Sequence, residues 1–266
     1  MRAMAGGAAR IQGQALPEMV IVFPLVVILM MSVVQLALLY RAKATLNNAT
    51  FLAARSGALN HGFIEPMRNV FLQRMAALAK IDPQRRDDGG SASFHAAPSA
   101  QGLLRMQRET VRYHDYPPLQ LLSPSKALFN HFATPVNELE RCAGTDCPSG
   151  GRFRLSSRRV LQIPNNNLDA RRDDLQRIEN RDVTLQDANL LSIRSRFCYA
   201  LEVPVANFVI WRSYGALFGN DPDWALCQQQ FPGQNAIPLK GHSLVRMQSP
   251  FRCEGDEENG VDCENI

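Results

Sequence analysis

The feature that most constrains this chain is an uncharged apolar run at residues 19–40. Its 22 residues would span about 33 Å as an α-helix, which is enough to cross the hydrocarbon core of a bilayer. Because backbone amides in lipid need partners within their own segment, the run must be helical. A cleaved secretory signal has a shorter apolar part followed by a small-residue cleavage site, and no such site occurs around Tyr40. The sequence therefore predicts a membrane-spanning helix, which we expect to continue to about Gly57 or Gly62.

Two residues inside the run depart from its apolar character. Pro24 lies near the start of the run, where a missing amide donor costs least. Gln35 lies near the far end. It is either a polar side chain tolerated near the outer end of the helix or part of a helix–helix hydrogen bond within an assembly. The sequence leaves both interpretations open.

The cysteines indicate the compartment of the remaining sequence. All six follow the apolar run, at Cys142, Cys147, Cys198, Cys227, Cys253 and Cys263. An even number confined to the part outside the membrane is typical of an oxidising compartment, where disulfides persist. The alternative is six unrelated reduced thiols. Local spacing favours the pairs Cys142–Cys147 and Cys253–Cys263, which leaves Cys198 for Cys227.

The charges flanking the run decide its orientation only weakly. Arg2 and Arg10 precede it, and Arg41 and Lys43 follow it closely, so the positive-inside rule is nearly balanced. The cysteines favour a cytoplasmic N-terminus and an exported C-terminal part. We therefore expect a single-pass protein whose C-terminal domain is exported.

The residues just before the run carry a further signal. Glu18 touches the edge of the predicted helix, where a lone carboxylate is costly and needs a partner. The spacing of Gly13 and Glu18 resembles that of type IV prepilins, in which a peptidase cuts after a glycine and the fifth residue of the mature chain is glutamate. The resemblance implies cleavage after Gly13, so that the new amine on Gln14 pairs with Glu18 of a neighbouring subunit. The alternative is an uncleaved anchor whose Glu18 reaches the membrane surface.

Small residues continue the helical pattern beyond the membrane. They form a stripe at helical spacing, made of Ala42, Leu46, Ala49 and Ala53. Small side chains let a neighbouring helix approach closely. With Glu18, Pro24, the Asn48-Ala49 pair and the Ala-Ala-Arg-Ser-Gly ending at 53–57, the segment resembles the TadE family of pilus assembly proteins. Residues 185–191, 203–205 and 244–250 are similar to segments of longer TadE-like proteins.

The TadE resemblance implies a function and a location. It implies a minor type IVb pseudopilin of a tight-adherence (Tad) pilus, in the bacterial inner membrane with its C-terminal domain in the periplasm, or in a surface pilus. The implied partners are the inner membrane, other pilins or pilus assembly proteins, and a prepilin peptidase. Such systems support adhesion and biofilm formation. Filament subunit and assembly factor stay open, and the alternative is a membrane-anchored periplasmic binding module without a filament role.

The rest of the chain predicts an α+β fold with a mainly antiparallel sheet on the long N-terminal helix. We expect a leader at 1–13, the helix at 14–60, a helix and flexible linker at 61–102, and an exported domain at 103–266. The expected helices are 66–79 and 123–132, the latter capped by Ser123. The expected strands are 110–113, 152–163, 193–201 and 243–248, and the expected loops are 82–102 and 142–151. The apolar stretch 203–211 is expected to be a core segment or a short helix, because it is too short to span a membrane.

Catalytic motifs are missing from the sequence. It has no H-E-x-x-H, G-x-S-x-G, Walker or G-x-G-x-x-G motif. Ser123 and Lys126 match S-x-x-K, but the companion K-T-G is absent. The net charge of +4 is spread along the chain and does not favour nucleic acid. We therefore expect no enzymatic activity, no cofactor, no metal and no nucleic-acid partner.

Overall fold

The computed structural model describes residues 15–78, 118–141, 153–166, 168, 176–178, 180–230 and 233–253. These residues form two compact units. The first comprises the chain up to Arg41 together with Cys198–Pro238. The second comprises Ala42–Phe197 and Leu239–Ile266.

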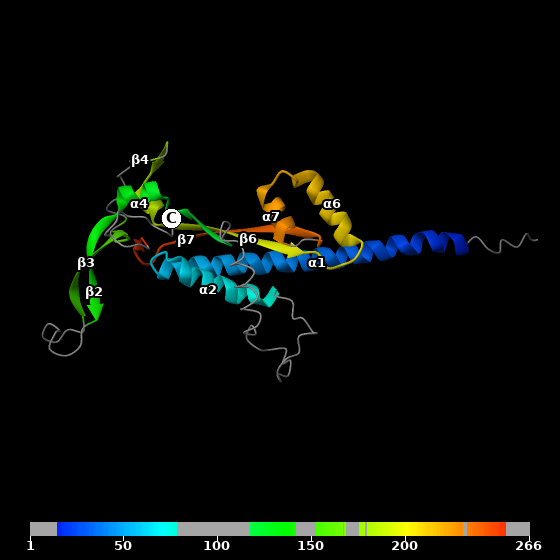
Figure 1. Cartoon of the computed structure of the whole chain (residues 1–266), viewed down its shortest axis with the longest axis horizontal. Coiled ribbons are helices and arrows are strands. Elements are labelled where there is room, and N and C mark those ends of the chain that lie inside the picture. The colour runs from blue at the N-terminus through cyan, green and yellow to red at the C-terminus, as the bar shows by residue number, and fades with distance from the viewer. Residues whose placement is uncertain are drawn as a thin grey trace, which may run out of the picture. The chain divides into compact units, whose positions relative to one another are not determined.

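The long helix α1 is the chain's most extended element, at Ala15–Leu59. It continues without interruption over 45 residues, as the sequence predicts (Figure 1). The helix ends where His61 and Gly62 take positive φ angles of 56° and 80°. The amide of Gly62 donates to the carbonyl of Gly57 at 2.9 Å, which supplies a partner for one of the last carbonyls of the helix. The end of α1 is therefore set by a left-handed turn, for which glycine is suited.

The first unit adds two short helices to the N-terminal part of α1. They are α6 at Ala206–Phe218 and α7 at Pro222–Gln230. Helix α7 begins as its sequence dictates, because Pro222 occupies the first helical position and the Asp221 carboxylate accepts from the amide of Asp223 at 3.0 Å. Of the two alternatives for residues 203–211, a core segment or a short helix, the short helix is confirmed. The helix exists and is longer, but only Ala206 among its residues is buried.

The second unit is built from antiparallel strands and short helices. One sheet has the order β1-β6-β7, with β1 at Leu119–Ser123, β6 at Leu190–Ala200 and β7 at Ala236–Arg246. The end of β6, from Cys198, and the start of β7, up to Pro238, belong to the first unit. The other sheet has the order β2-β3-β8, at Thr134–Arg141, Phe153–Ile163 and Phe251–Arg252. A hairpin joins β4 at Gln176–Ile178 to β5 at Arg181–Val183. The helices are α2 at Ile64–Met75, the 3-10 helix η1 at Ala76–Leu78, α4 at Lys126–Phe132 and α5 at Leu185–Ala188. The predicted α+β class with mainly antiparallel pairing is confirmed.

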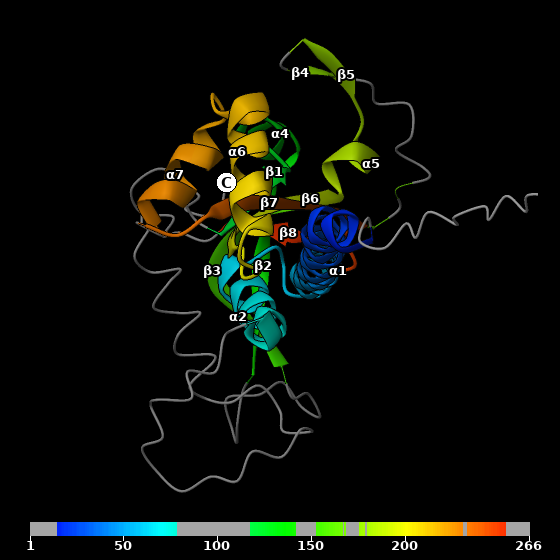
Figure 2. The same cartoon turned by 90° about the vertical axis from the view of Figure 1, so that its right-hand side faces the viewer.

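The second half of α1 is part of the core of the second unit. Helix α2 runs beside it in both views (Figure 1, Figure 2). At Gly57 a side-chain carbon would lie 2.8 Å from Cγ of Met67 in α2 and 2.9 Å from Cδ2 of Leu191 in β6. Both distances are shorter than carbon–carbon contact allows, so a side chain at position 57 would force Met67 and Leu191 to shift. Phe71 and Met75, which follow Met67 at intervals of four residues on α2, are buried as well.

Two local predictions need correction. Ser125, not Ser123, caps α4, since its hydroxyl accepts from the amide of Leu128 at 3.4 Å. Ser123 instead ends β1, where it lies opposite Ser192 of β6. Strand β7 begins at Ala236, whereas the sequence predicts a strand from 243. Its first four residues are all buried, so apolar and polar side chains do not alternate there and the sequence pattern does not indicate a strand. The expected strand 110–113 and the expected loops 82–102 and 142–151 lie outside the described residues.

Candidate functional site

The N-terminal half of α1 is apolar on every side and exposed. An 18-residue window within Met19–Leu59 has a mean hydropathy of 2.7, and almost none of it is buried by the protein. Exposed large side chains occur at consecutive positions, including Ile21, Val22 and Phe23. A helix that is apolar all round needs an apolar environment, and here the protein does not supply it. This helix is a single-pass membrane anchor, and it is the one helix within the described ranges that is long and apolar enough to span a bilayer.

The predicted processing residues lie at the start of this anchor. Gly13 and Gln14 lie outside the described residues. Glu18 lies in the first turns of α1, where its backbone is helical. Pro24 is inside the helix and exposed. Cleavage after Gly13 stays a prediction.

The small-residue stripe is covered by the chain itself. Ala42, Leu46, Ala49 and Ala53 are all fully buried. At Leu46 the covering element is strand β7, because a side-chain carbon added to Gly241 would lie 3.4 Å from Cγ of Leu46 and 2.6 Å from Oγ1 of Thr50. The element that approaches closely at this level is therefore a strand of the same chain rather than a neighbouring helix.

Polar groups fix the register of this helix–sheet contact. The buried hydroxyl of Thr50 donates to the carbonyl of Leu46 at 2.7 Å and also shares a hydrogen bond with the hydroxyl of Ser195 in β6. A hydroxyl has only one proton, so Ser195 is the donor to Thr50. The Lys43 ammonium donates to the carbonyl of Lys240 in β7. These bonds select one alignment of α1 on the strands, which apolar packing alone would specify less tightly.

Gln35 is the buried exception in the exposed part of α1. It is 0% exposed, although Val34 and Leu36 on either side are exposed. Its Oε1 accepts from the amides of Glu202 at 3.2 Å and Val203 at 2.8 Å. The sequence offered a surface position or a contact with another subunit for this residue. The structure instead places it in a contact with the loop that leads into α6.

Charged groups surround Tyr199 close to the same loop. Burial raises the pKa of the Tyr199 hydroxyl above its ordinary value of 10.0, and the negative charge of Glu202 raises it further. The positive charge of Arg41 on α1 acts in the opposite direction and lowers this pKa. Tyr199, Glu202 and Arg41 therefore lie within electrostatic reach of one another.

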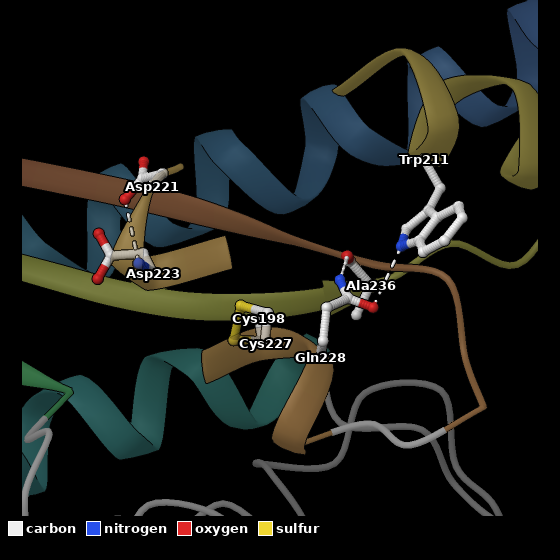
Figure 3. Close-up of a disulfide and its surroundings, with 7 residues drawn as sticks. All are labelled: Cys198, Trp211, Asp221, Asp223, Cys227, Gln228 and Ala236. Carbon is white, nitrogen blue, oxygen red and sulfur yellow. Dashed lines mark hydrogen bonds between the residues drawn. A yellow bond between two sulfur atoms is a disulfide. The ribbon is translucent and has the colours of Figure 1, made fainter. Parts of the chain in front are cut away.

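A disulfide holds α7 in the first unit. The structure joins Cys198 at the end of β6 to Cys227 in α7, with a Cα–Cα distance of 5.4 Å (Figure 3). The sequence predicted this pair, because local spacing favoured pairing the other four cysteines with one another. Next to it, Gln228 accepts from the indole N–H of Trp211 at 3.2 Å and donates to the carbonyl of Ala236 at 3.0 Å. The amide side chain thus links α6, α7 and β7, as Figure 3 shows.

The other cysteines are only partly described. Cys253 is also disulfide-bonded. Its partner lies outside the described residues, because Cys198 and Cys227 already pair with each other. Cys142, Cys147 and Cys263 lie outside the described residues as well. The two remaining pairs stay a prediction.

Sequence reasoning missed two side-chain groups. Trp211 and Tyr214 of α6 pack against Trp224 of α7, with ring centroids 5.7 Å and 5.4 Å apart. The i, i+3 spacing of Trp211 and Tyr214 was the available signal. Ser192 and His242 are hydrogen-bonded at 3.0 Å across β6 and β7, which no local motif indicates. In the part of the chain that the structure describes, no group of three or more His, Cys, Asp or Glu side chains gathers as a metal site would require.

Comparison with known proteins bears on the anchor alone. Residues 13–55 match the family model of the TadE-like protein family. No curated protein and no solved structure matches the chain. The matched segment begins at Gly13, includes the whole apolar part of α1 and ends just after the buried stripe. The chain therefore carries a TadE-like N-terminal segment, at residues 13–55, which supports a pseudopilin-like, Tad pilus-associated role at the level of the family.

Proposed function

We propose that this chain is a pseudopilin-like component of a Tad pilus, acting as a minor subunit or as a membrane-anchored assembly factor that supports adhesion and biofilm formation. The observation that carries the proposal is the position of the TadE-like match, which coincides with the membrane anchor and the stripe beyond it. The proposed role is structural rather than enzymatic. The proposed location is the bacterial inner membrane, with the C-terminal domain in the periplasm.

The two halves of α1 differ in which surfaces are free to contact other molecules. The stripe from Ala42 to Ala53 is occupied by the chain's own strands, so it is not available to another subunit. The apolar surface of residues 19–34 is not covered by the protein. Contacts with other pilins would therefore use this lipid-exposed part. A prepilin peptidase would act just before it, at Gly13.

Intact-mass spectrometry of the protein from its native membrane tests the processing. We expect a mature chain that begins at Gln14, and we expect the G13A variant to keep its leader. The matched control is G7A, which changes another glycine of the leader and should be processed normally. A wild-type chain that still begins at Met1, or a G13A chain of mature size, would contradict the proposal.

Deletion of the gene tests the link to the filament. We expect loss or marked reduction of pili and of surface attachment, restored by the wild-type gene and by G7A but not by G13A. The E18Q variant should be processed but should restore piliation poorly, because its neutral side chain cannot pair with the amine of Gln14 as an ion. Normal pili and attachment in the deletion strain would instead favour a periplasmic binding module.

A further inference from the structure

The position of Gln35 along α1 gives its depth in the membrane. The span begins at Met19, sixteen residues before Gln35. At 1.5 Å per residue this separation is about 24 Å. The hydrocarbon core is about 30 Å thick, so Gln35 lies about 6 Å inside its far edge. The exposed apolar side chains of Val33, Val34 and Leu36 are consistent with lipid at this level.

The loop 201–205 is therefore held at the edge of the hydrocarbon. Gln35 accepts from two consecutive backbone amides of this loop, those of Glu202 and Val203. An irregular segment with unpaired amides is costly at this depth, because no water is present to satisfy them. The buried glutamine thus supplies the acceptor that the loop needs there. Glu202 itself is exposed, which places the loop at the boundary between lipid and water rather than within the hydrocarbon.

Helix α6 starts directly after this loop and carries apolar side chains that the protein does not cover. Val205 precedes the helix, and Phe208 and Val209, which are both 53% exposed, lie in its first turns. At 100° per residue Phe208 and Val209 share one face of the helix with Arg212, which is also exposed. Val205, which is 51% exposed, comes just before this face. Figure 1 shows α6 starting beside α1.

We propose that α6 is an interfacial membrane helix, whose first turns insert Val205, Phe208 and Val209 into the outer part of the leaflet opposite the leader. The partner that covers this apolar face of α6 is the lipid bilayer that α1 spans. Amphipathic helices bind in this way when an apolar face lies against acyl chains and a basic side chain reaches the headgroups, as Arg212 would here. Trp211 and Tyr214 on the same helix pack against Trp224 of α7, which leaves the side of Phe208 and Val209 uncovered. The inference rests on the membrane anchor and is independent of the pilus role.

Tryptophan fluorescence offers a direct test, because the chain has only two tryptophans. The W224F variant leaves Trp211 in α6 as the sole reporter. We would reconstitute the full chain in vesicles of phosphatidylethanolamine and phosphatidylglycerol that contain lipids brominated on the acyl chain. We expect bromine near the headgroup to quench Trp211 more strongly than bromine near the terminal methyl. Strong quenching by aqueous acrylamide with none by brominated lipid would overturn the proposal.

A matched pair of variants separates lipid contact from simple proximity to the membrane. In the W224F background, F208S with V209S removes the proposed lipid contact and should lose most of the quenching by brominated lipid. L217S removes a leucine that is 76% exposed near the C-terminal end of α6, away from its first turns, and should leave the quenching unchanged. Equal effects of the two changes would contradict an oriented helix. As a control, circular dichroism of each variant should give the helix content of the W224F chain, which would indicate that the fold is retained.

A photo-crosslinker at position 208 identifies the occupant in native membranes. Benzoylphenylalanine in place of Phe208 should yield adducts with phospholipid. A discrete adduct with a second polypeptide, without lipid adducts, would show that a protein covers this face and would overturn the proposal. Neither result depends on cleavage at Gly13 or on pilus formation, so this inference and the proposed function can fail separately.

Discussion

Ser195 of β6 donates a hydrogen bond to Thr50 of α1, and both hydroxyls are completely buried. Thr50 in turn donates to the carbonyl of Leu46 one turn earlier. Gly241 of strand β7 lies next to this pair of hydroxyls. Because it has no side chain, it leaves room for the hydroxyl oxygens of Thr50 and Ser195. Within the second unit, the part of α1 that follows Arg41 is thereby aligned with the sheet at one register.

Replacing Thr50 by valine tests the importance of this alignment. Valine keeps the shape of threonine but leaves the buried Ser195 hydroxyl without its acceptor, which costs about 1–3 kcal/mol. We expect T50V to lower the thermal unfolding midpoint of the full chain in detergent. The double variant T50V/S195A removes both hydroxyls and should recover a large part of the loss. S195A is measured as well. If the loss in the unfolding midpoint of T50V/S195A equals the sum of the losses in T50V and in S195A, the two hydroxyls do not interact.

Replacing Gln35 by leucine tests the contact between α1 and the loop before α6. Leucine cannot accept from the amides of Glu202 and Val203, so we expect local opening of the loop to become easier by about 1–3 kcal/mol. Hydrogen exchange of these two amides in detergent should therefore accelerate. The control L36A changes the adjacent exposed residue and should leave both rates unaltered. Unchanged exchange in Q35L would mean that other groups hold the loop.

The disulfide between Cys198 and Cys227 should stabilise the first unit. It closes a loop with a sequence separation of 29 residues. The chain-entropy relation gives about 3–4 kcal/mol for a loop of this length. We expect C198S/C227S to unfold at a clearly lower temperature than the wild type. C198S alone should lose almost as much, because either change breaks the bond, and a wild-type midpoint in the double variant would contradict the expectation.

The titration of Tyr199 reports on its burial and on the charges around it. Its pKa is raised above 10.0 by burial and by Glu202, against the opposing effect of Arg41. The folded chain therefore holds this proton more tightly than the unfolded chain does. The resulting stability is complete below pH 10.0 and is lost as the pH rises through the folded pKa.

The measurement is the difference in phenolate absorbance between the wild type and Y199F during an alkaline titration in detergent. We expect a midpoint above 10.0. E202Q should lower the pKa of Tyr199, and R41Q should raise it further, because each removes one of the two opposing charges. A midpoint at or below 10.0 would show that the hydroxyl is accessible to water.

The anchor could be predicted from the sequence because its physics is local. An uncharged run of 22 residues has to be helical in a bilayer whatever surrounds it. The end of α1 was predicted at about Gly57 or Gly62 and lies at Leu59. The helix predicted at 66–79 lies at Ile64–Met75, and its apolar spacing fits one buried face. The antiparallel α+β class also followed from short strands separated by turn residues.

Strands and caps that depend on distant partners were harder to predict. The first half of β7 is buried on both faces, so it lacks the alternation that marks a half-exposed strand. The sequence predicts Ser123 as the cap of α4, but Ser123 pairs with β6 and Ser125 is the cap instead. In each instance the deciding neighbour lies far away along the chain.

The sequence by itself determined that a membrane helix leads into an α+β domain, because hydrophobicity and periodicity are properties of consecutive residues. Only the tertiary structure decided what meets that helix: Gln35 contacts the loop at 202–203, and strand β7 covers the stripe at Leu46. The hydrogen bonds of Gln35 to this loop join residues 167 and 168 positions apart, and the bond from Lys43 to Lys240 of β7 joins residues 197 positions apart. No local pattern encodes them, since they depend on how the folded chain buries its remaining polar and apolar groups together.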